Sequence, residues 1–118
     1  MKKITWVLVS TTSRKEAEKI GRALLSERLV ACYGLYPKTK SVYFWPPRSG
    51  KLETSRGPLL VLETLPRHYA RIARQVRQLH SDRVPFIGRL EIGGVGEDFY
   101  GWMEDEVAGN SGNLKAKR

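Results

Sequence analysis

The sequence is short of cysteine and of long apolar runs, and both shortages limit what the protein can be. Its single cysteine, Cys32, cannot form a disulfide within one chain, which suits a reducing compartment. Hydrophobic residues make up 41% of the 118 residues, and no apolar run approaches the ~20 residues of a membrane-spanning helix. The N-terminus also lacks the apolar segment and cleavage site of a secretion signal. We therefore expect a cytoplasmic protein that does not cross a membrane.

Sequence motifs of common enzymes are lacking too. No Gly-x-Ser-x-Gly turn, Walker phosphate loop or His-Glu-x-x-His pair occurs in the chain. The glycine-rich stretch 93–96 has neither the lysine nor the parallel-sheet context of a phosphate loop, and we interpret it as the exit of a strand. These absences favour a protein without enzymatic activity.

Acidic residues are scarce relative to basic ones, since 12 Asp and Glu stand against 21 Lys and Arg for a net charge of +9. The length suits one domain with a single core. We place this domain at residues 1–107 and expect residues 108–118 to form a basic, disordered tail, because the tail has no acid and almost no apolar residue. The positive charge favours contact with polyanions, although it also serves solubility alone.

The chain begins with the pattern of a strand followed by a helix. Residues 4–11 are rich in β-branched and apolar side chains and are predicted to form a central strand. Ser13 and Glu16 have the spacing of a capping box, in which each side chain accepts a hydrogen bond from a backbone N–H at a helix start. Apolar residues then recur at helical spacing, so we expect this helix to run to about Arg28.

The rest of the chain favours a hairpin, a helix, a strand and a short last helix. Residues 31–64 have the propensity of two long strands, bent where Pro37-Lys38 and Gly57-Pro58 interrupt them. The apolar stripe of the second helix consists of Tyr69, Ile72, Ala73, Val76 and His80. A fourth strand is predicted at residues 87–95, and Asp98 is the expected N-cap of the last helix.

The element order β-α-β-β-α-β-α predicts an α+β fold of the ferredoxin-like type. Two β-α-β halves with right-handed crossovers give an antiparallel sheet with both helices on one face. The other face, with the aromatic side chains of the long bent hairpin, then has no cover from its own chain. An exposed apolar face of that size indicates an interface with a partner. We expect Tyr43, Trp45 and Trp102 to lie in this interface.

Short motifs occur in a fixed order along the chain: Glu27-Arg28-Leu29-Val30-Ala31-Cys32, Ser41 to Trp45, Gly50-Lys51-Leu52, His80 to Ile87, and Phe99-Tyr100-Gly101-Trp102. In order and spacing they resemble the CutA divalent-cation-tolerance family over residues 4–107. The resemblance implies a compact homotrimer, in which the hairpins of three copies pair edge to edge. It also implies a role in divalent-cation tolerance without catalysis.

His80 and Cys32 are the candidate metal ligands, because imidazole and thiolate groups bind ions such as copper. Each has an alternative interpretation that stays open. His80 could be a helix-terminal residue packed in an interface, and Cys32 could be a small buried apolar residue. CutA proteins often have a cysteine and a glutamate where this chain has Ser10 and Phe86. The resemblance therefore implies weak binding of copper or another divalent cation. His68, on the polar side of the second helix, is expected at the surface.

Two other functions remain open from the sequence. Ferredoxin-like trimers that resemble PII signalling proteins hold small anions in clefts between subunits, and Lys51, Arg83 and Arg89 are candidates for such a cleft. A nucleic-acid-binding module is favoured by the charge, but the chain lacks the aromatic motifs with which similar sheets stack bases. We therefore expect the chain itself and a small anion as partners, rather than a nucleic acid or a membrane.

Overall fold

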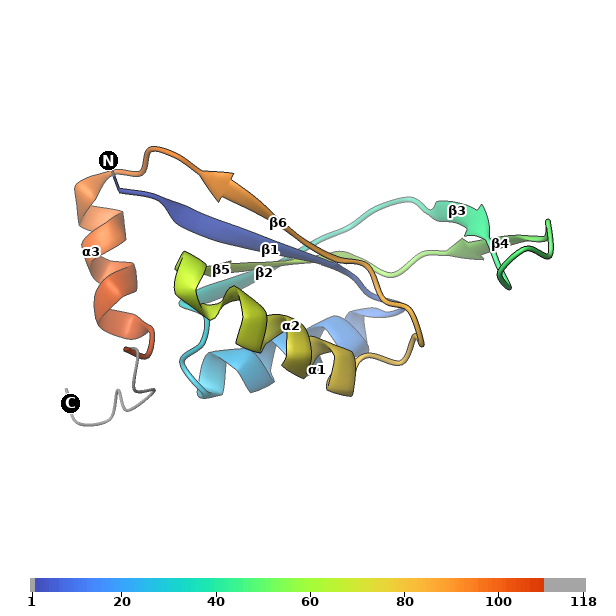
Figure 1. The fold of residues 1–118 in the computed structure, drawn as a ribbon, viewed down its shortest axis with the longest axis horizontal. Helices are drawn as coiled ribbons and strands as arrows, with labels where there is room; N and C mark the ends of the chain where they lie inside the picture. Colours follow the sequence, from blue (N-terminus) through green and yellow to red (C-terminus); the bar gives the residue numbers. More distant parts are fainter. Residues whose placement is uncertain (1, 110–118) are drawn as a thin grey trace.

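The helices and strands follow the predicted order, except that each long strand of the hairpin is divided in two. A computed structural model describes residues 2–109 (Figure 1). The elements are β1 Ile4–Ser10, α1 Arg14–Ser26, β2 Cys32–Tyr36, β3 Ser41–Phe44, β4 Leu52–Ser55, β5 Leu59–Thr64, a 3-10 turn Pro66–His68, α2 Tyr69–Leu79, β6 Ile87–Ile92 and α3 Glu97–Glu106.

The main sheet has the strand order β2-β5-β1-β6, and every neighbouring pair is antiparallel. This confirms the predicted ferredoxin-like α+β architecture. β3 and β4 form a separate two-stranded ribbon that extends beyond the sheet (Figure 1), and we call residues 41–55 the arm. The arm helps to give the chain its elongated shape, with principal extents of 50 × 26 × 22 Å.

The arm is separated from the sheet by a break in each long strand, at the two places where the sequence predicts only a bend. The pairing of β2 with β5 ends at Tyr36 and Leu59, and the pairing of β3 with β4 resumes at Ser41 and Ser55. Each break contains a proline, which has no N–H to donate to a strand ladder. We call residues 37–40 the first break and residues 56–58 the second break.

The helices α1 and α2 cover one face of the sheet (Figure 1), which confirms the predicted layering. Alternate residues of the central strands point toward these helices, because successive side chains of a strand lie on opposite faces. The resulting core consists of Val7, Val9, Ala17, Ile20, Leu24, Leu29, Val30, Leu60, Leu62, Ile72 and Val76.

The start and end of α1 show how local chemistry sets its limits. Ser13 Oγ accepts a hydrogen bond from the Glu16 N–H at 3.0 Å, as predicted, whereas the Glu16 carboxylate accepts from the N–H of Thr12 rather than of Ser13. The helix ends at Ser26 instead of near Arg28, a correction of two residues. Arg28 has a φ of 60°, a left-handed conformation that a right-handed helix does not contain.

The helix α3 lies across one end of the sheet (Figure 1). It packs there with Ile4 and Trp6, which alternate along β1 with core residues and therefore lie on the face that α1 and α2 leave open. Met103 and Val107 pack there against Ile4 and Leu65 in a second buried cluster. The rest of that face stays open, and Leu90 of β6 is 54% exposed. No helix within residues 2–109 is long and apolar enough to cross a membrane.

The start of α3 and the start of the predicted tail both differ from the prediction. The N-cap is Gly96, so Asp98 lies inside the first turn, where its charge complements the helix dipole instead of capping a backbone N–H. Ala108, which the sequence assigns to the tail, is buried, and its N–H donates to the carbonyl oxygen of Arg28 at 2.7 Å. The remainder of the predicted tail, residues 110–118, lies outside the described residues.

Candidate functional site

His80, the first metal candidate, caps the end of α2 and uses both of its ring nitrogens in hydrogen bonds. Its side chain is fully buried. Nδ1 accepts a hydrogen bond from the Asp82 N–H at 3.0 Å, and Nε2 lies 2.6 Å from the Ser10 carbonyl oxygen. The backbone N–H of Asp82 can only donate, and the carbonyl oxygen of Ser10 can only accept. The proton of the neutral His80 ring therefore resides on Nε2. A metal ion at His80 would have to replace one of these two hydrogen bonds.

Glu16 joins the start of α1 to the turn that follows α2. Its carboxylate accepts hydrogen bonds from the Thr12 N–H and Thr12 Oγ1, both at 2.9 Å, and from the Ser81 N–H at 2.6 Å. His80 Nε2 lies 3.7 Å from the same carboxylate. Burial by itself raises the pKa of Glu16, but the hydrogen bonds from Ser81 and Thr12 outweigh it and lower the pKa to about 2.

Glu16 is therefore expected to make the stability of the protein depend on acid. Its pKa falls from 4.5 to about 2 on folding, so the stabilisation is complete above pH 4.5 and is lost as the pH falls from 4.5 to 2. The Glu16→Gln variant, which cannot carry the charge, should lose at most about 3 kcal/mol of unfolding free energy at pH 7. Urea titrations at pH 7, 4 and 3 measure this difference.

Glu104→Gln, on the exposed side of α3, is the matched control and should change the unfolding free energy by less than ~0.5 kcal/mol. The difference between wild type and Glu16→Gln should shrink as the pH is lowered. A constant difference from pH 7 to pH 3 would show that the charge of Glu16 does not stabilise the fold.

Cys32, the second metal candidate, lies at a different place in the sheet. It pairs with Glu63 of β5, whereas Ser10, which binds His80, pairs with Leu59. Four residues along a strand span roughly 13 Å, so one ion cannot bind both Cys32 and His80. Burial raises the pKa of the Cys32 thiol, and the nearby Glu63 raises it further, which disfavours the thiolate that binds metals.

The described residues 2–109 contain no group of three or more His, Cys, Asp and Glu side chains that could hold a metal ion. Ser10 offers His80 only its carbonyl oxygen. Phe86, where family members often have a glutamate, is 54% exposed and has no metal-binding atom. The donor set of these described residues therefore does not fit a preformed site for a divalent cation.

His68 is buried, which corrects the prediction that it lies at the surface. Its side chain is within 2.7 Å of the Ala108 carbonyl oxygen, and Arg67 donates to the same oxygen at 3.0 Å. Burial lowers the pKa of His68, as do the neighbouring charges of Arg67 and Arg71, although the hydrogen bond to Ala108 raises it. The prediction was wrong because His68 belongs to the 3-10 turn before α2, where the periodicity of that helix does not apply.

Of the three residues proposed for an anion cleft, Arg83 and Lys51 each contact Trp45, whereas Arg89 lies apart from them. Arg83 stacks on the ring of Trp45 at 5.6 Å, next to the arm. Lys51 is at the tip of the arm, where its carbonyl oxygen accepts from the Trp45 N–H. Arg89 belongs to β6 and stacks on Tyr69 of α2 at 4.8 Å. A cleft containing all three would need more than one copy of the chain.

Tyr43 and Trp45, two of the predicted interface residues, border a cavity of about 410 Å³ between the arm and the turn at residues 81–84. Tyr43 is 42% exposed and Trp45 is half-buried. The third predicted interface residue, Trp102, is 43% exposed on α3, at the other end of the molecule (Figure 1). All three therefore retain accessible apolar surface, at two separate places.

The opposite face of the arm is more exposed, and sequence analysis did not single it out. In the pairing of β3 with β4, Val42 and Phe44 lie on the same face as Leu52, which pairs with Phe44. These side chains are 51%, 69% and 65% exposed. The alternation of the strand shows that Phe44 and Tyr43 point in opposite directions. Because Tyr43 borders the cavity next to residues 81–84, we call its side of the arm the inner face and the side with Phe44 the outer face.

The sequence profile of the family described as "CutA1 divalent ion tolerance protein" matches residues 5–106. The divalent-cation tolerance protein CutA of Pyrococcus horikoshii is 31% identical over 86% of this chain and 97% of its own length. The corresponding protein of Archaeoglobus fulgidus is 28% identical over 86% of this chain and 96% of its own length.

Solved structures agree with the sequence comparison. The crystal structure of CutA1 from Pyrococcus horikoshii superposes with a TM-score of 0.81 and 28% identity, covering 89% of this chain and 99% of that one. CutA from Archaeoglobus fulgidus, described as periplasmic, superposes with a TM-score of 0.81 and 26% identity over 87% of this chain and 97% of its own. Fold and sequence thus agree over nearly the whole described chain, and the protein belongs to the CutA1 divalent ion tolerance family.

Proposed function

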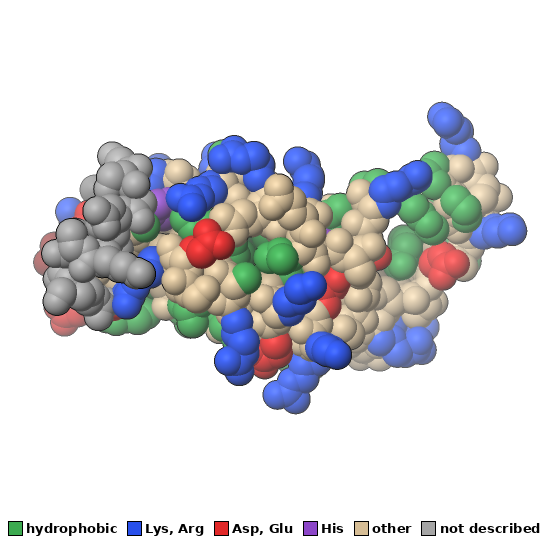
Figure 2. Space-filling view, turned by 90° about the horizontal axis from the view of Figure 1, so that it is seen from below, with side chains coloured by type: hydrophobic (Ala, Val, Ile, Leu, Met, Phe, Trp, Pro, Cys, Tyr) green, Lys and Arg blue, Asp and Glu red, His purple; other side chains and the backbone are tan. Residues whose placement is uncertain are grey.

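We propose that this protein acts in divalent-cation tolerance as a homotrimer and without catalysing a reaction. The family supports the role in cation tolerance. The observation that supports assembly is the apolar surface of the arm, formed by Val42, Phe44 and Leu52, all more than half exposed. Figure 2 shows hydrophobic side chains gathered at the end of the molecule that carries the arm.

A single chain leaves this surface without cover. The arm pairs only within itself in the described residues, and a two-stranded ribbon on its own is marginally stable in water. Burial of exposed apolar side chains against a second copy would stabilise the arm by about 25 cal/mol per Å² of apolar surface. The arm therefore needs a partner, and another copy of the chain is the partner that the family resemblance implies.

The position of the apolar surfaces supports a ring of copies. The arm lies at one end of the elongated chain, while Trp102 and Phe99 are exposed on α3 at the other end (Figure 1). Two different surfaces that join copies head to tail form a closed ring when the rotation between copies permits closure. The strands β2 and β6 are also the edges of the sheet and are available for pairing between copies.

Native mass spectrometry tests this proposal directly. The expected mass is three times the 13.4 kDa of one chain, and it should persist at low micromolar concentration. Light scattering at the same concentrations provides an independent measurement. A dimer or a stable folded monomer would contradict the proposal.

The proposed cation response leads to a prediction about metal binding. Any Cu²⁺ or Zn²⁺ bound by this protein should bind weakly and depend mainly on His80, because one or two protein ligands leave most of the coordination shell to water. Calorimetry with Cu²⁺ should detect far weaker binding than at a site with four protein ligands. His80→Gln should reduce that binding further, and circular dichroism should verify that the variant is folded.

His68→Gln is the matched control, since His68 is buried against Ala108 at the other end of α2. It should leave weak Cu²⁺ binding unchanged. Tight Cu²⁺ binding that survives His80→Gln would contradict the prediction and would direct attention to His68 or to the acidic side chains of α3. If no binding is detected, the prediction of direct binding is wrong, and the tolerance role must operate without metal binding by the protein.

We also propose that the protein resides in the cytoplasm, where its single thiol would stay reduced. Relatives differ in this respect, since the Archaeoglobus fulgidus protein is described as periplasmic and a rice relative as chloroplastic. Fractionation of cells that produce the full chain tests the proposal. Recovery with periplasmic marker proteins would contradict it.

A further inference from the structure

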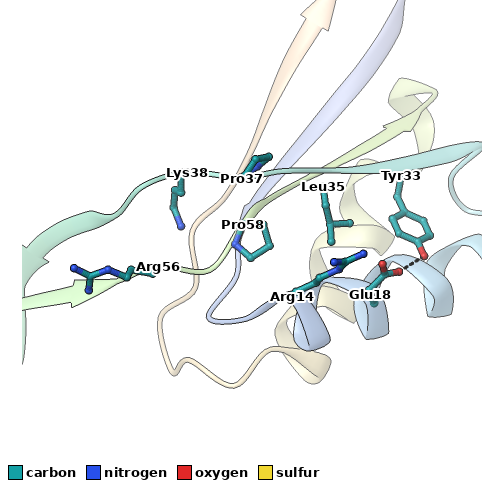
Figure 3. A pocket seen from close by; sticks show the side chains of 8 residues that line it. All are labelled: Arg14, Glu18, Tyr33, Leu35, Pro37, Lys38, Arg56 and Pro58. Carbon is teal, nitrogen blue, oxygen red and sulfur yellow. Dashed lines mark hydrogen bonds between the residues drawn. The ribbon is translucent and has the colours of Figure 1, made fainter.

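A cavity of about 610 Å³ lies between the start of α1 and the two breaks that carry the arm. Figure 3 shows Tyr33 and Leu35 of β2 pointing toward α1, with Arg14 and Glu18 of α1 facing them. Lys38 of the first break and Pro58 of the second break complete the part of the lining that faces the arm. The cavity thus has an apolar floor and a charged rim.

The charge around this cavity is predominantly positive. Arg14, Lys38 and Arg56 line it, and Glu18 is its one acid. Glu18 is already engaged, because it accepts a hydrogen bond from the Tyr33 hydroxyl at 2.6 Å and lies 3.7 Å from the Arg22 guanidinium.

Neither Arg14 nor Arg56 has a carboxylate within 4.0 Å among residues 2–109. Guanidinium groups bind phosphate and carboxylate through paired N–H donors, and clustered cations in a cleft concentrate anions.

The walls of the cavity are held in place before any ligand binds. The Thr11 N–H and Oγ1 donate to the Pro58 carbonyl oxygen at 3.3 and 2.7 Å, and Lys38 donates to the Gly57 carbonyl oxygen. These bonds connect the two breaks to each other and to the loop before α1. Because these walls are already in place, the protein loses little conformational entropy when a ligand binds. More of the energy of the ligand contacts then contributes to affinity.

Two glycines allow the second break and the ring of Tyr33 to pack closely against α1 and the loop before it. A Cβ on Gly57 would lie well inside the contact distance of the Thr11 carbonyl oxygen and 2.7 Å from the backbone nitrogen of Ser13. A Cβ on Gly21 of α1 would lie 2.5 Å from the ring of Tyr33. The ring can therefore pack flat against α1 and form the floor of the cavity.

We propose that this cavity binds a small organic anion, with its phosphate or carboxylate group at Arg14, Lys38 and Arg56 and its apolar part on Tyr33 and Leu35. The inference goes beyond cation tolerance, because it assigns a ligand of the opposite charge. It also does not depend on trimer formation, because all of the lining residues belong to one chain. It differs from the cleft suggested by the sequence, whose three basic residues lie elsewhere.

Four probes separate the contributions of the charge and of the apolar part. Phenyl phosphate and benzoate combine an anionic group with a ring, inorganic phosphate has the charge alone, and phenol has the ring alone. In calorimetry on the full chain, phenyl phosphate or benzoate should bind at least about tenfold more tightly than both inorganic phosphate and phenol. The better of these two ligands identifies the anionic group that the cavity prefers.

Arg14→Gln and Arg56→Gln should each weaken binding of that better probe by about tenfold, because each removes a charged donor at the rim. Arg74→Gln, on the exposed side of α2 and outside the cavity, removes the same charge and should leave the affinity unchanged. Equal losses in all three variants would overturn the proposal, since they would indicate attraction by net charge alone. The absence of binding by both ring-containing anions to the wild type would overturn it as well.

Discussion

Phe44→Asp is expected to convert the protein from a trimer into smaller species. Phe44 is 69% exposed and shares its face of the arm with Val42 and Leu52, so a partner copy is expected to cover it. An unpaired carboxylate buried in an interface costs roughly 3–5 kcal/mol, and a symmetric trimer contains three of them. Light scattering and native mass spectrometry at low micromolar concentration measure the loss of assembly.

Tyr43→Asp and Trp45→Asp are expected to act in the same direction but on the other face of the arm. Because Tyr43 and Trp45 border the cavity next to residues 81–84, these substitutions would also disturb the contact between the arm and its own domain. The comparison with Phe44→Asp therefore shows which face of the arm contributes more to assembly. An effect confined to Tyr43→Asp would assign the interface to the inner face.

Gln78→Asp, on the exposed side of α2, is the control for the added charge. Gln78 belongs to α2, which contributes none of the residues of the proposed interface, so this variant should remain a trimer. If Phe44→Asp keeps the wild-type mass over the same concentration range, the outer face of the arm is not an interface. The exposed apolar surface would then need another explanation.

Gly57→Ala is expected to destabilise the protein by about 3 kcal/mol, which corresponds to a fall of roughly 10 °C in the melting temperature. The added methyl group would overlap the Thr11 carbonyl oxygen and crowd the Ser13 nitrogen. These atoms belong to the backbone between β1 and α1 and cannot move aside as a flexible side chain can. The second break must then shift away from α1, with loss of the hydrogen bonds between Thr11 and Pro58.

Gly101→Ala is the matched control for this substitution. A Cβ at Gly101 meets no atom within 4 Å, and the residue lies in the middle of α3. Alanine is a better helix former than glycine, so this variant should be stabilised by about 0.5–1 kcal/mol. Scanning calorimetry of both variants compares the two cases. If the Gly57→Ala variant had the same melting temperature as the wild type, the second break would not be packed against the loop before α1.

Most of the element order could be predicted because it depends on short-range patterns. The β-branched run of β1 and the apolar stripe of α2 are periodic signals that need no knowledge of the tertiary structure. The two bends in the long strands were predicted at Pro37-Lys38 and Gly57-Pro58, since a proline cannot donate to a strand ladder. The structure turns each bend into a break, because the strand pairing stops on one side and resumes on the other. The errors occurred at element ends, such as Arg28, where a single left-handed residue ends a helix.

The candidate site was predicted less well, because its chemistry depends on residues that are distant in the sequence. His80 was identified from its position at the end of a helix, but its availability depends on hydrogen bonds with Ser10 and Asp82. The separation of Cys32 from His80 follows from the register of β2, β5 and β1. No pattern along one strand contains that register.

The sequence by itself determined the family, the order of strands and helices and the presence of an apolar hairpin, because these are recorded in motif spacing and in periodicity. Only the tertiary structure decided which face of the arm is exposed, and that Arg14, Lys38 and Arg56 surround one cavity. Those three residues come from a helix start and from two strand breaks. Their proximity results from pairing and packing across the chain, and local sequence patterns carry no information about such distances.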